Sequence, residues 1–118
     1  MKRSFLLLSL ALAVAISTPL AARADDFPTS GRVEYVLECM QKHDGKYEYL
    51  YKCSCVIDHI AKEMTYDDYV AMSTALRNQT MGGERGAVFR DPAPVNDMAN
   101  KYKALQASAH KACYVTQR

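Results

Sequence analysis

The sequence lacks several features that would place it in a common functional class. It contains no tryptophan and no run of basic residues, and its 15 basic side chains nearly balance its 13 acidic ones. Without clustered positive charge, the chain offers no attractive field to a nucleic-acid backbone or to an anionic membrane surface. We therefore expect no nucleic-acid partner.

The motifs of several catalytic chemistries are also missing. No G-x-S-x-G nucleophile motif occurs, and His43, His59 and His110 do not combine with a nucleophile and an orienting carboxylate in any known pattern. The haem-attachment spacing C-x-x-C-H and the C-x-x-C pair of thiol oxidoreductases are absent as well. We expect surface or capping roles for the histidines, no catalytic residue and no cofactor.

The one long apolar run lies at the start of the chain. Lys2 and Arg3 precede the apolar residues 5–16, and Ala22 and Ala24 then occupy the small positions of an A-x-A cleavage site. A run of this length is too short for a membrane-spanning helix, which needs roughly 20 residues. The sequence therefore predicts a cleaved signal peptide over residues 1–24, a single helical domain over residues 25–118, a periplasmic location and no stable membrane anchor.

The exported part would be a small domain that needs covalent support. Cleavage after Ala24 removes three basic residues and leaves 12 basic against 13 acidic side chains. A chain of this size has a core that is sufficient but not generous. An even number of cysteines in a small exported chain predicts disulfide bonds. All four cysteines lie in this part, so we expect two disulfides among Cys39, Cys53, Cys55 and Cys113.

Apolar residues recur at helical spacing in four segments. Thr65 followed by Asp68 resembles a capping box and marks the start of the third segment. No strand-like alternation competes with this pattern. The sequence predicts an all-α, disulfide-stapled bundle of about four helices, over residues 32–42, 46–64, 66–78 and 96–114.

The first predicted helix would bury Val33, Val36, Leu37 and Met40.

The segment of residues 80–94 is predicted to be a long loop without regular structure. It holds three of the five glycines and two prolines. Long loops in compact domains are often functional, and Phe and Arg are common in binding hot spots. Together with a tyrosine exposed at the start of the second helix, the loop supplies the partner-binding residues that we expect, which are Glu84, Arg85, Phe89, Arg90 and Tyr49.

The cysteines of the C-x-C motif cannot bond to each other on a helix. Residues two apart on an α-helix point about 160° away from one another, so Cys53 and Cys55 should bond to different elements. Cys39 can reach either of them, and Cys113 takes the other. Both pairings stay open; we favour Cys39–Cys55 with Cys53–Cys113.

Copper binding is the alternative function. Cys55 and His59 are separated by four residues and share a helix face, and Cys53 lies nearby. Thiolates and thioethers suit Cu(I), and five methionines follow the signal peptide. A periplasmic copper chaperone would use Cys53, Cys55 and His59, whereas structural disulfides would consume these thiols.

The segment "CSCVIDHIAKEMTYDDYV" resembles a motif of small exported four-cysteine helical proteins of proteobacteria, a largely uncharacterised group. They carry C-x-C, an apolar stretch and then a Thr/Ser-Tyr helix start, and the resemblance covers about a third of the chain. Some are encoded near periplasmic dehydrogenases and cytochromes. The resemblance implies an exported helical fold and a redox enzyme as partner. We expect a non-catalytic protein that serves as a binding or accessory module for another periplasmic protein.

Overall fold

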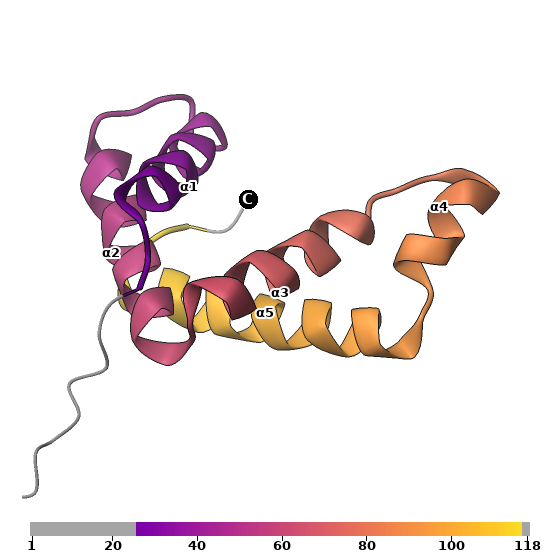
Figure 1. Cartoon of the computed structure of the whole chain (residues 1–118). Helices are drawn as coiled ribbons and strands as arrows, with labels where there is room; N and C mark the ends of the chain where they lie inside the picture. The colour runs from indigo at the N-terminus through magenta and orange to yellow at the C-terminus, as the bar shows by residue number, and fades with distance from the viewer. Residues whose placement is uncertain (1–25, 117–118) are drawn as a thin grey trace, which may run out of the picture.

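The computed structural model describes residues 26–116, which form five α-helices and no strand (Figure 1). The all-helical prediction is confirmed, whereas the predicted signal peptide of residues 1–24 lies outside the described residues. The helices are α1 (Thr29–Gln41), α2 (Glu48–Glu63), α3 (Tyr66–Asn78), α4 (Gly83–Arg90) and α5 (Ala93–Ala112).

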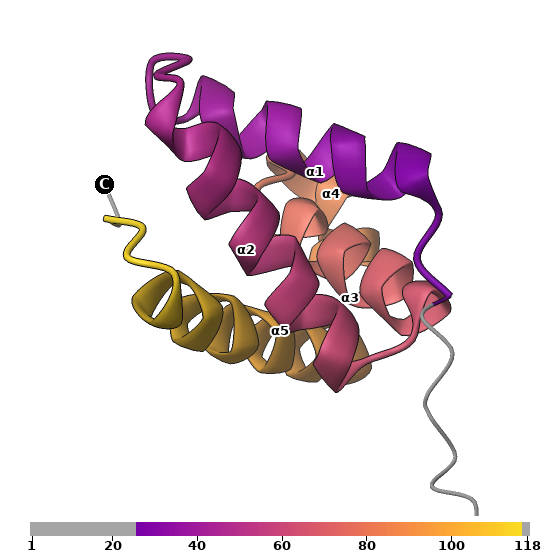
Figure 2. The same cartoon turned by 90° about the vertical axis from the view of Figure 1, so that its left-hand side faces the viewer.

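The helices form two antiparallel pairs. Helices α1 and α2 make one hairpin, and α3 and α5 make a longer one (Figures 1 and 2). The turn between α1 and α2 contains Asp44 and Gly45, both with positive φ, a conformation that glycine adopts without strain. Helix α2 also packs against α5, so it joins the two hairpins, while α4 lies at the outer end of the α3–α5 pair.

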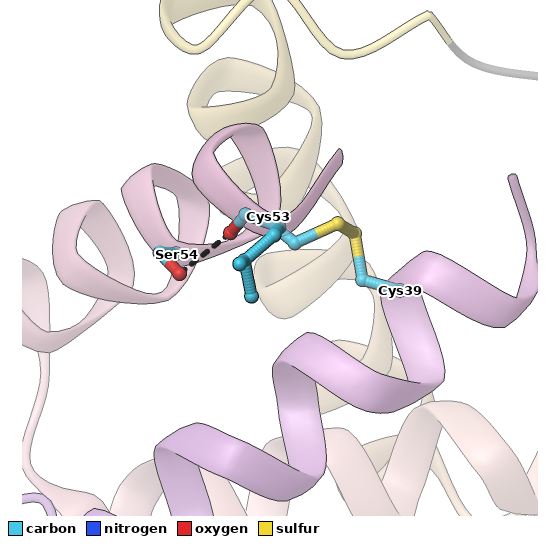
Figure 3. The surroundings of a disulfide bond; sticks show 4 residues. Cys39, Cys53 and Ser54 are labelled. Carbon is cyan, nitrogen blue, oxygen red and sulfur yellow. Dashed lines mark hydrogen bonds between the residues drawn. A yellow bond between two sulfur atoms is a disulfide. The ribbon is translucent and has the colours of Figure 1, made fainter. Parts of the chain in front are cut away.

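The two disulfides leave α2 in different directions. Cys53 bonds to Cys39 of α1, and Cys55 bonds to Cys113 at the end of α5. Both cross-helix bonds are confirmed, but the pairing that we favoured is wrong. Cys53 lies on the fully buried face of α2, and α1 covers the part of that face around Cys53 (Figure 3). The sequence shows that the two cysteines diverge, but not which neighbouring helix covers each face.

The Cys39–Cys53 bond also sets the rotation of α1. With Cys39 turned towards α2, the residues one turn before it, Tyr35 and Val36, are buried. Leu37 is two residues from Cys39 and therefore points to the opposite side of the helix. Val33 and Leu37 are 50% and 56% exposed, so the prediction that they belong to the core is wrong.

Helix α2 supplies the centre of the core. Val56, Ile57 and Ile60 are almost completely buried, together with Cys53. Around them lies an aromatic cluster, in which the Tyr69 ring lies 5.9 Å from the Tyr102 ring and 6.5 Å from the Tyr35 ring, measured between centroids. Tyrosines from α1, α3 and α5 therefore meet where the two hairpins join.

The start of α3 is fixed from two directions. The Thr65 hydroxyl accepts a hydrogen bond from the Asp68 amide at 3.2 Å, which confirms the predicted cap. The Tyr66 amide donates to both carboxylate oxygens of Asp26, at 3.1 and 3.0 Å. Phe27 packs its ring 5.3 Å from that of Tyr69. The segment before α1 therefore ties the first hairpin to the second.

The paired cysteines bear on the compartment in which the protein works. Each of the four cysteines is disulfide-bonded, and such bonds persist in oxidising, extracytoplasmic compartments. Within residues 26–116, none of the helices has the length and apolar character required to cross a membrane.

The Cys55–Cys113 disulfide is expected to be reduced first. Thiol attack requires access to a sulfur atom. Cys55 is exposed although Cys113 is buried, whereas Cys39 and Cys53 are both buried. Limited reduction followed by alkylation and peptide mapping should label Cys55 and Cys113 before Cys39 and Cys53. Earlier labelling of Cys39 and Cys53 would contradict the burial described here, and a peptide linking Cys39 to Cys55 in unreduced protein would contradict the pairing.

Alkaline pH should destabilise the fold through its buried phenols. Burial raises the pKa of the Tyr35 hydroxyl to about 12 and raises that of Tyr102 as well. Tyrosine in the unfolded chain ionises at about pH 10. The stability that comes from keeping the buried phenol protonated is therefore fully present below that pH and is lost as the pH rises through about 12. By about pH 12, Tyr35 alone should lower the free energy of unfolding by about 2 kcal/mol. Urea denaturation across this range measures the fall. Tyr35→Phe should reduce it, and an unchanged pH dependence in that variant would contradict the assignment.

Candidate partner-binding surface

The outer end of the α3–α5 hairpin carries exposed apolar side chains. We call this surface the α4 tip and define it by Met81, Glu84, Arg85, Val88 and Phe89. Val88 is 70% exposed and Phe89 is 54% exposed, and Met81 is also exposed. The tip lies at the far end of the hairpin from α1 and α2 (Figure 1). Its apolar residues therefore contribute little to the core.

The segment is a helix, so the prediction that residues 80–94 lack regular structure is wrong for its central part. Three side-chain hydrogen bonds to backbone carbonyls hold α4 against its flanking segments. Arg90 Nη1 donates to the Met81 carbonyl at 2.7 Å, and Gln79 Nε2 donates to the Arg90 carbonyl at 3.1 Å. Asn96 Nδ2 donates to the Asp91 carbonyl at 3.1 Å. These partners are up to eleven residues apart, which is why local sequence pattern does not reveal them.

Two of the glycines have defined structural roles in the α4 tip. Gly83 begins the helix with a φ of +74°, a conformation that other residues adopt only with strain. Gly86 is the buried residue of α4, and a Cβ added there would lie 2.9 Å from the Met81 carbonyl oxygen. Glycine at residue 86 thus allows α4 to fold back closely on the segment that precedes it.

The predicted contact residues of this segment differ in their availability. Glu84, Arg85 and Phe89 are exposed. Arg90 is used within the protein, because its Nε donates to Asp91 Oδ1 at 2.7 Å while its Nη1 holds Met81. The charge and hydrogen bonding of Asp91 raise the pKa of Arg90. Arg90 therefore supports the shape of the tip.

Tyr49 is the predicted contact residue that the structure contradicts. It is only 8% exposed, and its ring stacks on that of His43 at 3.9 Å between centroids. Its neighbours Tyr47 and Tyr51 are exposed, and their hydroxyls lie 3.3 Å apart. Tyr49 is thus buried against the turn before α2, and the other two tyrosines of this alternating trio are exposed. His43 is itself only 7% exposed, so the prediction of a surface role is wrong for this histidine.

The copper-binding alternative loses its thiolate ligands in the structure. Cys53 and Cys55 are both in disulfides, so neither sulfur is available as a thiolate. Within residues 26–116, neither His59 nor any other residue belongs to a group of three or more His, Cys, Asp or Glu side chains arranged to hold a metal ion. Ser54, beside these cysteines, donates its hydroxyl to the Leu50 carbonyl at 2.6 Å (Figure 3).

Two surface features lie outside the predicted site. One is an apolar groove of about 270 Å³ between α1 and α2, lined in part by Val33, Leu37 and Leu50. The other is a cleft of about 470 Å³ where α1, α3 and α5 meet. In that cleft, Lys103, Gln106 and His110 follow one another at helical spacing on α5. This polar spacing is visible in the sequence and could have indicated that the face is not part of the core.

Comparison of the chain with protein-family models, with curated protein sequences and with solved structures finds no match. The geometry of the described residues therefore carries the functional argument.

Gly86→Ala should loosen the α4 tip. The added methyl group would meet the Met81 backbone, and such overpacking typically costs about 1–3 kcal/mol. Amide hydrogen exchange in α4 should accelerate, while exchange in α2 stays close to that of the wild type. Gly82→Ala is the matched control, because its Cβ would have no atom within 4 Å and its φ is −82°. Equal exchange rates in the two variants would contradict the tight packing at Gly86.

Proposed function

We propose that this chain is a periplasmic, non-catalytic binding protein that contacts another periplasmic protein through the α4 tip. The observation that supports this most directly is the exposure of Val88 and Phe89 on a hydrogen-bonded frame away from the core. A mobile loop would lose much of its binding energy to ordering, whereas a frame that is already folded loses little.

The chemistry of the α4 tip resembles a small protein-binding surface. Phe89 and Val88 supply apolar area, and burying side chains of this kind yields about 1.5–3 kcal/mol each. Glu84 and Arg85, exposed in the first turn of α4, would form a polar rim carrying both signs of charge. A surface with this balance suits a partner whose contact area is not strongly charged. The α4 tip is defined by only five residues, whereas a standard interface uses about 20–30 residues on each side. We therefore expect a small interface.

The compartment and the class of partner follow from separate arguments. The N-terminal pattern of residues 1–24 is that of an export signal, and the disulfides fit an oxidising compartment. A bacterial periplasm satisfies both conditions. The resemblance of the C-x-C segment to exported proteins encoded near redox enzymes favours a periplasmic dehydrogenase or cytochrome as the partner.

A photo-reactive phenylalanine analogue placed at Phe89 should cross-link to the partner in intact cells. The same analogue at Leu37 is the matched control, since Leu37 is 56% exposed and Phe89 is 54% exposed, yet they lie on different surfaces. Mass spectrometry of the cross-linked species identifies the partner. Cross-links formed at Leu37 and not at Phe89 would assign binding to the α1–α2 groove instead.

Phe89→Ala should then weaken binding of the identified partner about tenfold or more, as expected for an aromatic hot spot. Its free energy of unfolding should stay within about 0.5 kcal/mol of the wild type, because the side chain is exposed. Calorimetry with the purified partner measures the first quantity and urea denaturation the second. Unchanged affinity would show that Phe89 is not part of the contact.

A further inference from the structure

The cleft where α1, α3 and α5 meet is a feature that the α4 tip does not use. We call it the basic cleft and define it by Lys42, His43, Leu76, Lys103, Gln106 and His110. It has a volume of about 470 Å³, within the usual range for small-molecule sites. The α5 residues of the cleft, Lys103 to His110, are 10 to 17 residues beyond the start of α5, which is about 15 to 25 Å along the helix. The cleft and the α4 tip are therefore separate sites.

The basic cleft continues inwards to the aromatic cluster of the core. A smaller space of about 110 Å³ shares five of the residues that define the cleft and is also lined by Tyr35, Tyr69 and Tyr102. An engineered apolar cavity of about 150 Å³ accommodates benzene. The inner space together with the outer cleft is thus large enough for one aromatic ring with a substituent at each end.

The inner end contains a polar group that the fold leaves unsatisfied. The Tyr35 hydroxyl is buried, and no donor or acceptor within the described residues meets it at hydrogen-bond distance and angle. The Gln106 side chain approaches it and lowers its pKa, as a weak hydrogen bond would, against the larger effect of burial. Leaving a buried donor unpaired costs about 1–3 kcal/mol. A phenylalanine would fill the same space without this cost. The hydroxyl is closed to solvent, so an acceptor that enters from the cleft would reach it only with a shift of the side chains around the inner space.

The outer part of the cleft carries excess positive charge. Lys42 and Lys103 are exposed at its edge. Arg77 and Glu38 line the inner space, and they neutralise each other through hydrogen bonds of 2.8 and 2.9 Å. Burial, followed by the charges of His43 and Lys42, lowers the pKa of His110. His110 is therefore not a source of charge in the cleft, and the positive charge open to an anion is that of Lys42 and Lys103.

We propose that the basic cleft binds a small aromatic acid that also carries a hydrogen-bond acceptor at the opposite end of its ring. The carboxylate lies outside, near the ammonium groups of Lys42 and Lys103. The flat ring lies against the apolar walls formed by Leu76, Tyr69 and Tyr102. The acceptor reaches inwards and takes the hydrogen bond that the Tyr35 hydroxyl lacks.

Three probe compounds separate the parts of this proposal. 4-Hydroxybenzoate has the acceptor, the ring and the carboxylate; benzoate lacks the inner acceptor; and 4-hydroxybenzamide lacks the charge. At ordinary ligand efficiency for molecules of this size, 4-hydroxybenzoate should bind with a Kd of about 1 mM or tighter. Benzoate should bind several-fold more weakly, and 4-hydroxybenzamide more weakly still. Calorimetry gives the affinities, and the largest NMR amide shifts should fall near Lys103 and His110.

Protein variants then locate each end of the ligand. Tyr35→Phe should weaken 4-hydroxybenzoate binding about tenfold, the usual effect of losing a charge-assisted or buried hydrogen bond, and leave benzoate binding unchanged. Lys103→Gln should weaken both carboxylates. Lys101→Gln is the matched control, because Lys101 is an exposed lysine of the same helix that does not line the cleft. Tyr35→Phe should be at least as stable as the wild type.

Several results would overturn the proposal. An unchanged ratio of 4-hydroxybenzoate to benzoate affinity in Tyr35→Phe would remove the inner contact. Equal binding of 4-hydroxybenzamide, or equal effects of Lys101→Gln and Lys103→Gln, would show that the cleft does not select an anion. Absence of binding by all three probes at about 10 mM, corresponding to less than about 3 kcal/mol of binding free energy, would exclude this ligand class.

Discussion

The structure depends on the two disulfides that leave α2 towards different helices. Because residues two apart on a helix point away from each other, Cys53 reaches inwards to α1 and Cys55 reaches α5. In a small domain these bonds constrain the unfolded chain, by about 3 kcal/mol for the shorter loop and about 4 kcal/mol for the longer. Helix α2 thereby becomes the element to which both hairpins are fixed.

The two disulfides explain why the fold tolerates loose packing between α1 and α3. With α1 and α5 both fixed to α2, α1 is not required to pack closely along α3. The contact between α1 and α3 consists in part of the Glu38–Arg77 ion pair and of the ring contact between Tyr35 and Tyr69. Surface ion pairs of this kind contribute little stability, about 0–1 kcal/mol. The region between α1 and α3 can therefore contain a cleft and the unsatisfied Tyr35 hydroxyl without loss of the fold.

The same two disulfides leave the far end of the α3–α5 hairpin without a role in the core. Helix α4 is fixed by hydrogen bonds from Arg90, Gln79 and Asn96, and its apolar side chains face outwards. The α4 tip lies before the start of α5, and the basic cleft is lined by the C-terminal half of that helix. A protein partner and a small ligand could thus occupy the molecule together, with α5 as the rigid element between their sites.

The sequence by itself determined the helical fold, the cap at Thr65 and the fact that Cys53 and Cys55 bond to different helices, because these follow from local periodicity and helix geometry. It also singled out residues 80–94 as a candidate binding segment, through their glycines and through Phe89 as a residue type common in binding hot spots. Only the tertiary structure decided the disulfide pairing, the burial of Tyr49, the helical form of α4 and the meeting of Tyr35 with His110 around the inner space next to the basic cleft. Each of these depends on how a helix is rotated about its own axis and on which element covers it, and contacts between residues distant in the chain fix both.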